Sequence, residues 1–145
     1  MQTQRMGVTL LELLIALTLL GIVISLAAPA LRSTMQVLAV RAARESAVGA
    51  FARARAIALH EGGAAIELSA RDDRITVRAP SGAIAHELLL APHDVDLLPD
   101  GSTDPVQLNY DAYGLGRMMS RTITLQAGGT TAGLTISSFG RVRRW

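Results

Sequence analysis

The chain has 145 residues, of which 50% are hydrophobic, and its formal net charge at pH 7 is +2. A net charge this small does not by itself indicate a strongly charged partner. The absence of cysteine excludes disulfides and thiol chemistry. Once an N-terminal segment of about 30 residues is set aside, the length leaves one small domain of about 115 residues.

A long apolar segment follows a short polar leader. Residues 8–31 carry a single formal charge, on Glu12, and Arg5 precedes them in the leader of residues 1–7. As a helix these residues reach about 36 Å, which is enough to cross a hydrocarbon core of about 30 Å. The sequence therefore predicts a membrane-spanning helix whose N-terminal end stays in the cytoplasm. A carboxylate inside such a helix is costly and usually marks a function, although a polar residue is also tolerated close to the membrane interface.

The same segment has to be compared with an ordinary secretory signal. The sequence Ala28-Pro29-Ala30 has the small-x-small form of a cleavage site. The apolar run is longer than a usual signal core, however, and Glu12 lies where that core is most apolar. These two features favour a retained helix over a cleaved secretory signal.

The helical character continues beyond Pro29 to about residue 60. An apolar face recurs at spacings of three and four residues in Val40, Ala43, Ala47, Phe51, Ala54 and Ala58. Gly62 and Gly63 end the pattern. One helix is predicted from Val8 to about His60, with a kink or a short melted turn at Pro29.

From Ala64 onward the hydrophobic period becomes two. Strands are expected around residues 66–68, 75–77, 83–90, 95–98, 106–110, 122–127 and 134–138, and Gly128-Gly129 marks a hairpin. A long helix followed by a run of antiparallel strands predicts an α+β head comprising residues 32–145.

The N-terminal motif resembles the class III signal of type IV pilins and type II secretion pseudopilins. The residues that carry this resemblance are Gly7 and the following Val8-Thr9-Leu10-Leu11-Glu12-Leu13-Leu14. The resemblance implies that a prepilin peptidase cuts between Gly7 and Val8 and that the amino group of Val8 is then methylated. It also implies that Glu12 neutralises the terminal amine of a neighbouring subunit during assembly. One departure is Val8, where the family usually has phenylalanine.

The C-terminal half is similar to the GspH/FimT branch of minor pilins. The similarity rests on the glycine-rich turn Tyr113-Gly114-Leu115-Gly116-Arg117, and on a last strand, from Leu134, that ends in Gly140-Arg141-Val142-Arg143. It implies the pilin fold and a subunit present in few copies. In type II secretion such a subunit joins a tip complex that primes or caps the pseudopilus, and some FimT relatives bind DNA for natural transformation.

The C-terminal residues are candidates for binding DNA. Three guanidinium groups and an indole lie within five residues, in Arg141, Arg143, Arg144 and Trp145, and such groups contact phosphates and stack on bases. Arg117 and Arg121 would join them if the hairpin brings them near. The alternative is a solvated strand end, with Arg141 bound to local carbonyls and Trp145 covering the sheet edge.

The sequence matches enzyme and metal-binding motifs only weakly. His60-Glu61 lacks the second histidine of a zinc-protease helix, and the sequence has no Gly-x-Ser-x-Gly elbow. Four aspartates in the loop between Pro92 and Pro105 match no calcium-loop spacing. No catalytic residue, metal ligand or cofactor is therefore expected.

Two classes of function remain open. The first is a structural minor pseudopilin for protein export, and the alternative is a minor type IV pilin that binds DNA through its arginine tail. Both imply other pilins or pseudopilins, a prepilin peptidase, an inner-membrane assembly platform and membrane lipid as partners. Both also imply a single-pass protein of the bacterial inner membrane with a periplasmic head, which reaches a filament tip after assembly. A plain anchored domain that is not cleaved at Gly7 is a third possibility.

Overall fold

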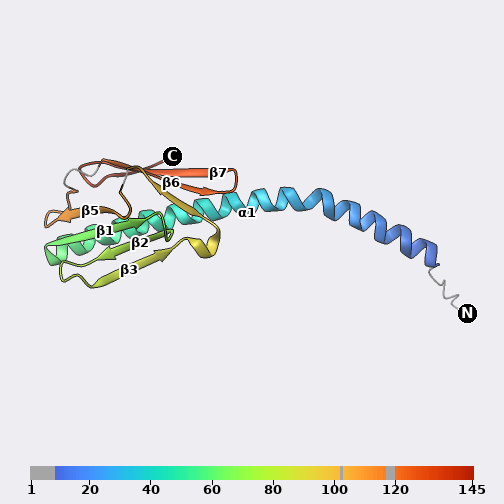
Figure 1. The fold of residues 1–145 in the computed structure, drawn as a ribbon, viewed down its shortest axis with the longest axis horizontal. Coiled ribbons are helices and arrows are strands. Elements are labelled where there is room, and N and C mark those ends of the chain that lie inside the picture. The colour runs from blue at the N-terminus through green and yellow to red at the C-terminus, as the bar shows by residue number, and fades with distance from the viewer. Residues whose placement is uncertain (1–8, 102, 117–119) are drawn as a thin grey trace, which may run out of the picture. The chain divides into compact units, whose positions relative to one another are not determined.

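A computed structural model describes residues 9–101, 103–116 and 120–145 (Figure 1). One α-helix precedes a series of strands and one short 3₁₀ helix. In chain order the elements are α1 (Leu10–Glu61), β1 (Gly63–Ser69), β2 (Arg74–Arg78), β3 (Ile84–Leu89), η1 (Ala91–His93), β4 (Asp96–Pro99), β5 (Val106–Asp111), β6 (Arg121–Ala127), β7 (Thr130–Ile136) and β8 (Val142–Arg144).

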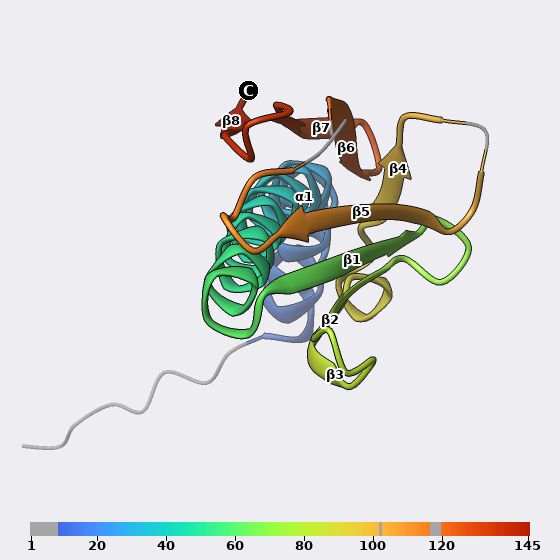
Figure 2. The same cartoon turned by 90° about the vertical axis from the view of Figure 1, so that its left-hand side faces the viewer.

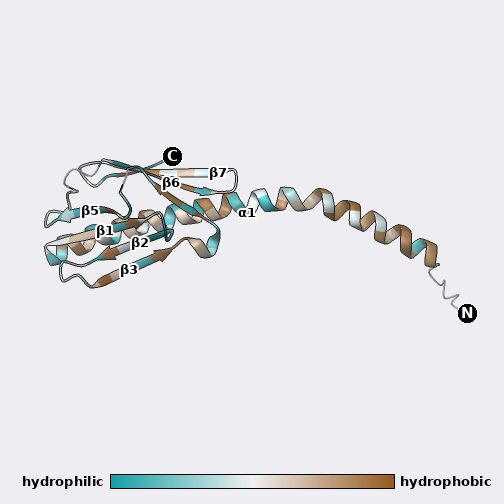
Figure 3. Ribbon diagram, in the orientation of Figure 1, coloured by the Kyte–Doolittle hydropathy of each residue, from teal (hydrophilic) through white to brown (hydrophobic). Residues whose placement is uncertain are grey.

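The chain divides into two compact units between Met35 and Gln36. The first unit holds the N-terminal part of α1, and its large apolar side chains are exposed all around the helix. Figure 3 shows hydrophobic colours along most of this part. α1 remains α-helical at Pro29, so the predicted melted turn is absent from the described helix.

The second unit is the head, and its core forms around one face of α1. All six residues of the predicted apolar face are buried, together with Ala50. Most of them are alanines, and Phe51, which is 1% exposed, is the largest side chain. Small side chains let a sheet approach the helix backbone closely, while the single large ring fills the space between them.

Two antiparallel sheets complete the head. Their strand orders are β3-β2-β1-β5 and β4-β6-β7-β8. Figure 2 shows the two sheets flanking the second half of α1, and the inward side chains of both sheets join the helix face in one hydrophobic core. The α+β architecture expected from the sequence, with one long helix packed on antiparallel strands, is thus confirmed.

Two element boundaries differ from the prediction. β7 begins at Thr130, directly after the Gly128-Gly129 turn, and ends at Ile136. A turn then separates it from β8: Gly140 N donates to the carbonyl of Ser137 at 2.8 Å, and Gly140 has a φ of +72°. The predicted last strand is therefore two strands, because a glycine in the left-handed region reverses the chain.

Carboxylates on both sides hold the acidic segment between η1 and β5 against the β1–β2 turn. Asp104 accepts hydrogen bonds from the backbone N–H groups of Ala70 (2.9 Å) and Arg71 (3.2 Å). Asp73 accepts one from the N–H of Leu97 at 2.8 Å. These aspartates satisfy backbone donors of turns and strand ends, which is a structural use of their charge.

Candidate functional site

The first turn of α1 is capped by Thr9. Its hydroxyl accepts a hydrogen bond from the backbone N–H of Glu12 at 3.2 Å, and the carbonyl of Thr9 accepts one from Leu13 N at 3.1 Å. A Thr followed three residues later by Glu is the capping-box pattern. The spacing of Thr9 and Glu12 in the sequence carries this signal.

Glu12 consequently occupies a defined place in the first helical turn. A carboxylate there is favoured by the positive end of the helix dipole. Glu12 is exposed, so it is accessible to another chain. The predicted cleavage and methylation positions, Gly7 and Val8, lie outside the described residues.

The helix that carries Glu12 meets the requirements for a membrane span. A window of 18 residues has a mean hydropathy of 2.6, and none of it is buried. Because its leucines and isoleucines are exposed, this surface needs either lipid or other helices around it. Length and composition alone support this conclusion.

The C-terminal arginines lie in a strand of the sheet and not in a free tail. β8 pairs with β7, so that Arg143 lies opposite Thr135 and Arg144 opposite Leu134. Trp145 extends the pairing, since its N–H and carbonyl both bond to Gly133, at 3.1 and 3.0 Å.

The indole of Trp145 lies against the backbone of Gly133. A Cβ at Gly133 would be 2.1 Å from Cζ2 of the ring, so the ring occupies the space that a side chain would need. The indole N–H donates to the hydroxyl of Thr135 at 3.2 Å, while Trp145 remains 56% exposed. One face of the ring is thus covered by the sheet, and part of the ring remains accessible.

The strand alternation separates the arginines. Arg143 and Trp145 share the outward face of the sheet. Arg144 points to the opposite side, where its guanidinium pairs with Glu45 of α1 at 3.2 Å. Arg141 is exposed in the turn before β8, and it is its backbone N–H that bonds locally, to Ser137 Oγ at 3.2 Å.

Of the two other arginines considered with this surface, the structure describes Arg121. Arg121 lies opposite Ile136, in the inward register of β6, and its guanidinium is close to Gly101. The expectation that it joins the tail is therefore wrong. Arg117 lies outside the described residues.

The described residues contain no group of three or more histidine, aspartate or glutamate side chains able to hold a metal ion. Among the three histidines, His86 has its Nδ1 3.0 Å from the guanidinium of Arg53. That contact joins β3 to α1 and is structural.

Comparison with known proteins identifies the fold. No protein-family model matches the sequence, and no curated protein matches it. Two crystal structures of the type IV minor pilin FimU from Pseudomonas aeruginosa strain PAO1 are similar, both at 18% identity. One has a TM-score of 0.56 and the match covers 73% of this chain and 87% of FimU; for the other the TM-score is 0.54, with 72% and 91% covered. The chain therefore has the pilin fold.

Proposed function

We propose that this protein is a minor pseudopilin of the GspH/FimT type, a structural subunit that primes or caps a type II secretion pseudopilus for protein export. The observation that carries the proposal is the combination of a pilin-fold head with an exposed apolar helix whose capped first turn holds Glu12. None of these features is catalytic, so the role is that of a building block.

In this proposal, the carboxylate of Glu12 drives assembly. In lipid, an unpaired carboxylate at the start of the helix is unfavourable, and so is an unpaired terminal amine. When two subunits meet, the carboxylate of one pairs with the amine of the other, and both penalties are relieved together. The Thr9 cap assists because it satisfies the N–H of Glu12 and leaves the carboxylate free for the neighbour.

The proposed route to the filament involves several partners. A prepilin peptidase removes residues 1–7 and methylates Val8, and an inner-membrane platform adds the subunit to other major and minor pilins. Until then, lipid surrounds residues 8–31 in the bacterial inner membrane, and the head lies in the periplasm.

The test is incorporation into filaments sheared from cells. The Glu12→Ala and Glu12→Gln variants should insert into the membrane and be processed, yet incorporation should fall to background because the carboxylate charge is missing. Thr18→Ala is the matched control, since it removes a polar side chain from the same exposed segment without removing a charge. Normal incorporation of Glu12→Gln contradicts the proposal.

A second candidate function is DNA capture for pilus-mediated uptake. The observation that favours it is the outward face shared by Arg143 and the exposed indole of Trp145, with Arg141 in the preceding turn. A guanidinium that contacts phosphate, beside a ring on which a base can stack, is a suitable pair for single-stranded nucleic acid. Arg144 contributes less to this surface because it is already paired with Glu45.

DNA binding by the full chain in detergent tests this alternative. The Arg141→Ala/Arg143→Ala double variant should weaken binding and flatten its dependence on salt concentration, whereas Arg144→Ala should have the smaller effect. If the wild-type chain does not bind DNA at low salt, the alternative is refuted.

A further inference from the structure

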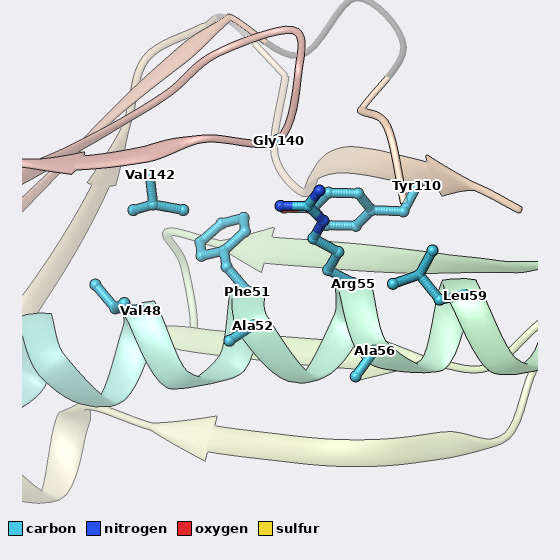
Figure 4. Close-up of a pocket in the computed structure, with 9 residues that line it drawn as sticks. All are labelled: Val48, Phe51, Ala52, Arg55, Ala56, Leu59, Tyr110, Gly140 and Val142. Carbon is cyan, nitrogen blue, oxygen red and sulfur yellow. The ribbon is translucent and has the colours of Figure 1, made fainter. Parts of the chain in front are cut away.

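A pocket of about 300 Å³ lies on the head between α1 and the turn that precedes β8. Figure 4 shows its apolar walls, with Phe51 and Val48 on α1 facing Val142 of β8. The exposed residues Ala52, Ala56 and Leu59 extend this apolar surface along the helix. Two polar side chains also line the pocket, those of Tyr110 and Arg55.

The hydroxyl of Tyr110 is buried without a partner. Tyr110 is only 3% exposed, and among the described residues its oxygen forms no hydrogen bond. Burial raises the pKa of Tyr110, and the nearby guanidinium of Arg55 opposes this effect without reversing it. The phenol is therefore protonated at neutral pH and has an unused O–H donor. A buried donor of this kind is rare in proteins and calls for an explanation.

The fold holds the Tyr110 ring in this position. Gly140 has a φ of +72°, and a Cβ there would be 2.9 Å from Cε1 of Tyr110 and 3.2 Å from the carbonyl of Gly114. Only glycine allows the turn to pass this close to the ring. The hydroxyl is thus positioned by packing and does not depend on a hydrogen bond.

Arg55 supplies a second donor beside the first. Figure 4 shows its guanidinium next to the phenol of Tyr110. Arg55 is exposed, and within the described parts of the chain its guanidinium forms no ion pair or hydrogen bond. The positively charged guanidinium therefore faces the pocket beside the buried phenol, and none of the described side chains that line the pocket carries a carboxylate. The complementary group is an anionic acceptor.

The apolar walls restrict the kind of anion. A single guanidinium balances one negative charge, so a doubly charged phosphate would remain uncompensated in a pocket that is otherwise largely apolar. A carboxylate carries one charge and accepts hydrogen bonds from a guanidinium. Its aliphatic stem would pack against Val48, Val142 and Leu59.

We propose that this pocket receives an acidic side chain of an adjacent subunit, whose carboxylate binds Arg55 beside the phenol of Tyr110. This inference rests on the proposed function as a filament subunit. A neighbouring subunit is the expected occupant because most of the lining residues belong to α1, the element through which assembly is proposed. The exposed Ala52, Ala56 and Leu59 beside the two donors would be covered by the same contact.

A tyrosine titration tests the pocket without any filament. The chain contains two tyrosines and no lysine, so in the full chain carrying Tyr113→Phe the alkaline change in absorbance reports Tyr110 alone, while arginine stays charged. The probes are N-acetylglutamate α-methylamide and the matching glutamine compound, at equal concentration and ionic strength in detergent. Only the glutamate probe should raise the midpoint, by about one pH unit, because a bound carboxylate disfavours the phenolate.

Variants of two neighbouring arginines make this titration decisive. Arg55→Gln should abolish the response to the glutamate probe, whereas Arg53→Gln, which alters another exposed arginine of the same helix, should preserve it. Equal midpoints with the two probes in the Tyr113→Phe chain, or a shift that persists in Arg55→Gln, would overturn the proposed carboxylate site.

Photocrosslinking in cells identifies the occupant. With benzoylphenylalanine in place of Ala52 in the full chain, the adduct should join another pilin-type subunit at a peptide that contains Asp or Glu, and Arg55→Glu should remove it. An adduct with a peptide lacking both residues overturns the proposed occupant. Loss of the filament function itself is detected separately, by the Glu12 variants, so the two failures are distinguishable.

Discussion

The two parts of α1 use the same helical backbone for opposite purposes. In the first unit, leucine and isoleucine side chains point outward in every direction, and Leu10, the most exposed of them, is 83% exposed. In the head, the buried face consists mainly of alanines with Phe51 as the single large side chain. The first part therefore exposes its large apolar side chains, and in the head the sheets of the same chain cover the apolar helix face.

This difference shows that hydrophobicity alone does not determine burial in this protein. The size of the side chains separates the two roles. Large apolar groups on all sides suit lipid or other helices, whereas small groups on one face suit close approach of a sheet. Variants that exchange these properties should affect one part and leave the other intact.

The largest effect is expected at Phe51. Phe51→Ala removes the largest side chain of the buried helix face, and it should lower the free energy of unfolding of the head by about 3–5 kcal/mol. Urea denaturation of the full chain in detergent, followed by the fluorescence of its single tryptophan, measures this change. Leu38→Ala, at a position 60% exposed on the same helix, should change it by less than about 0.5 kcal/mol. Equal losses in the two variants would contradict the assigned faces.

The converse variant is Leu19→Arg in the exposed apolar segment. An arginine near the centre of a spanning helix raises the free energy of insertion by about 3 kcal/mol, so the fraction of chain that resists alkaline extraction from membranes should fall. The head should unfold at the same urea concentration as before. Leu38→Arg provides the control, because it should leave membrane retention unchanged. Retention of Leu19→Arg at the wild-type level would refute the membrane role of this segment.

A smaller effect is expected where Trp145 lies against Gly133. Gly133→Val places a side chain in the space of the indole, which should displace the ring, shift its fluorescence to the red and lower stability by about 1–3 kcal/mol. Gly129→Val is the matched control, since a Cβ there has open space. Unchanged emission in Gly133→Val would show that the ring does not lie on the strand.

The smallest effect concerns Tyr110 and depends on pH. Because burial raises its pKa, the folded head holds the phenolic proton more tightly than the unfolded chain does. This contribution to stability is complete below pH 10 and decreases as pH rises above that value. Tyr110→Phe should remove this alkaline loss and, at neutral pH, stabilise the head by about 1 kcal/mol by deleting an unpaired hydroxyl. The Tyr113→Phe variant should still lose stability above pH 10. If the Tyr110→Phe variant loses it as well, Tyr110 is not the source of the pH dependence.

Local patterns in the sequence predicted much of the fold. The spacing of six apolar residues identified the buried helix face, because a helix repeats every 3.6 residues whatever surrounds it. The glycine pair at 128–129 likewise marked the β6–β7 hairpin. The apolar run that contains Glu12 likewise predicted the exposed apolar helix, because hydropathy and length are local properties of a sequence.

Contacts between residues that are far apart in the sequence could not be predicted from local patterns. Arg144 meets Glu45 only because β8 returns alongside α1, and this pairing diverts one arginine from the predicted DNA-binding set. The pocket on α1 depends on Tyr110, Arg55 and the Gly140 turn meeting in space. The Thr9 cap, by contrast, could have been predicted, because the capping-box spacing of Thr9 and Glu12 is visible in the sequence.

The most direct test of the central claim is the intact mass of the protein extracted from the membrane. The account predicts a mass equal to residues 8–145 plus one methyl group, as expected for a subunit cut after Gly7 and methylated on Val8. The mass of the unprocessed chain, or of a product that begins near Leu31, would contradict the filament assignment.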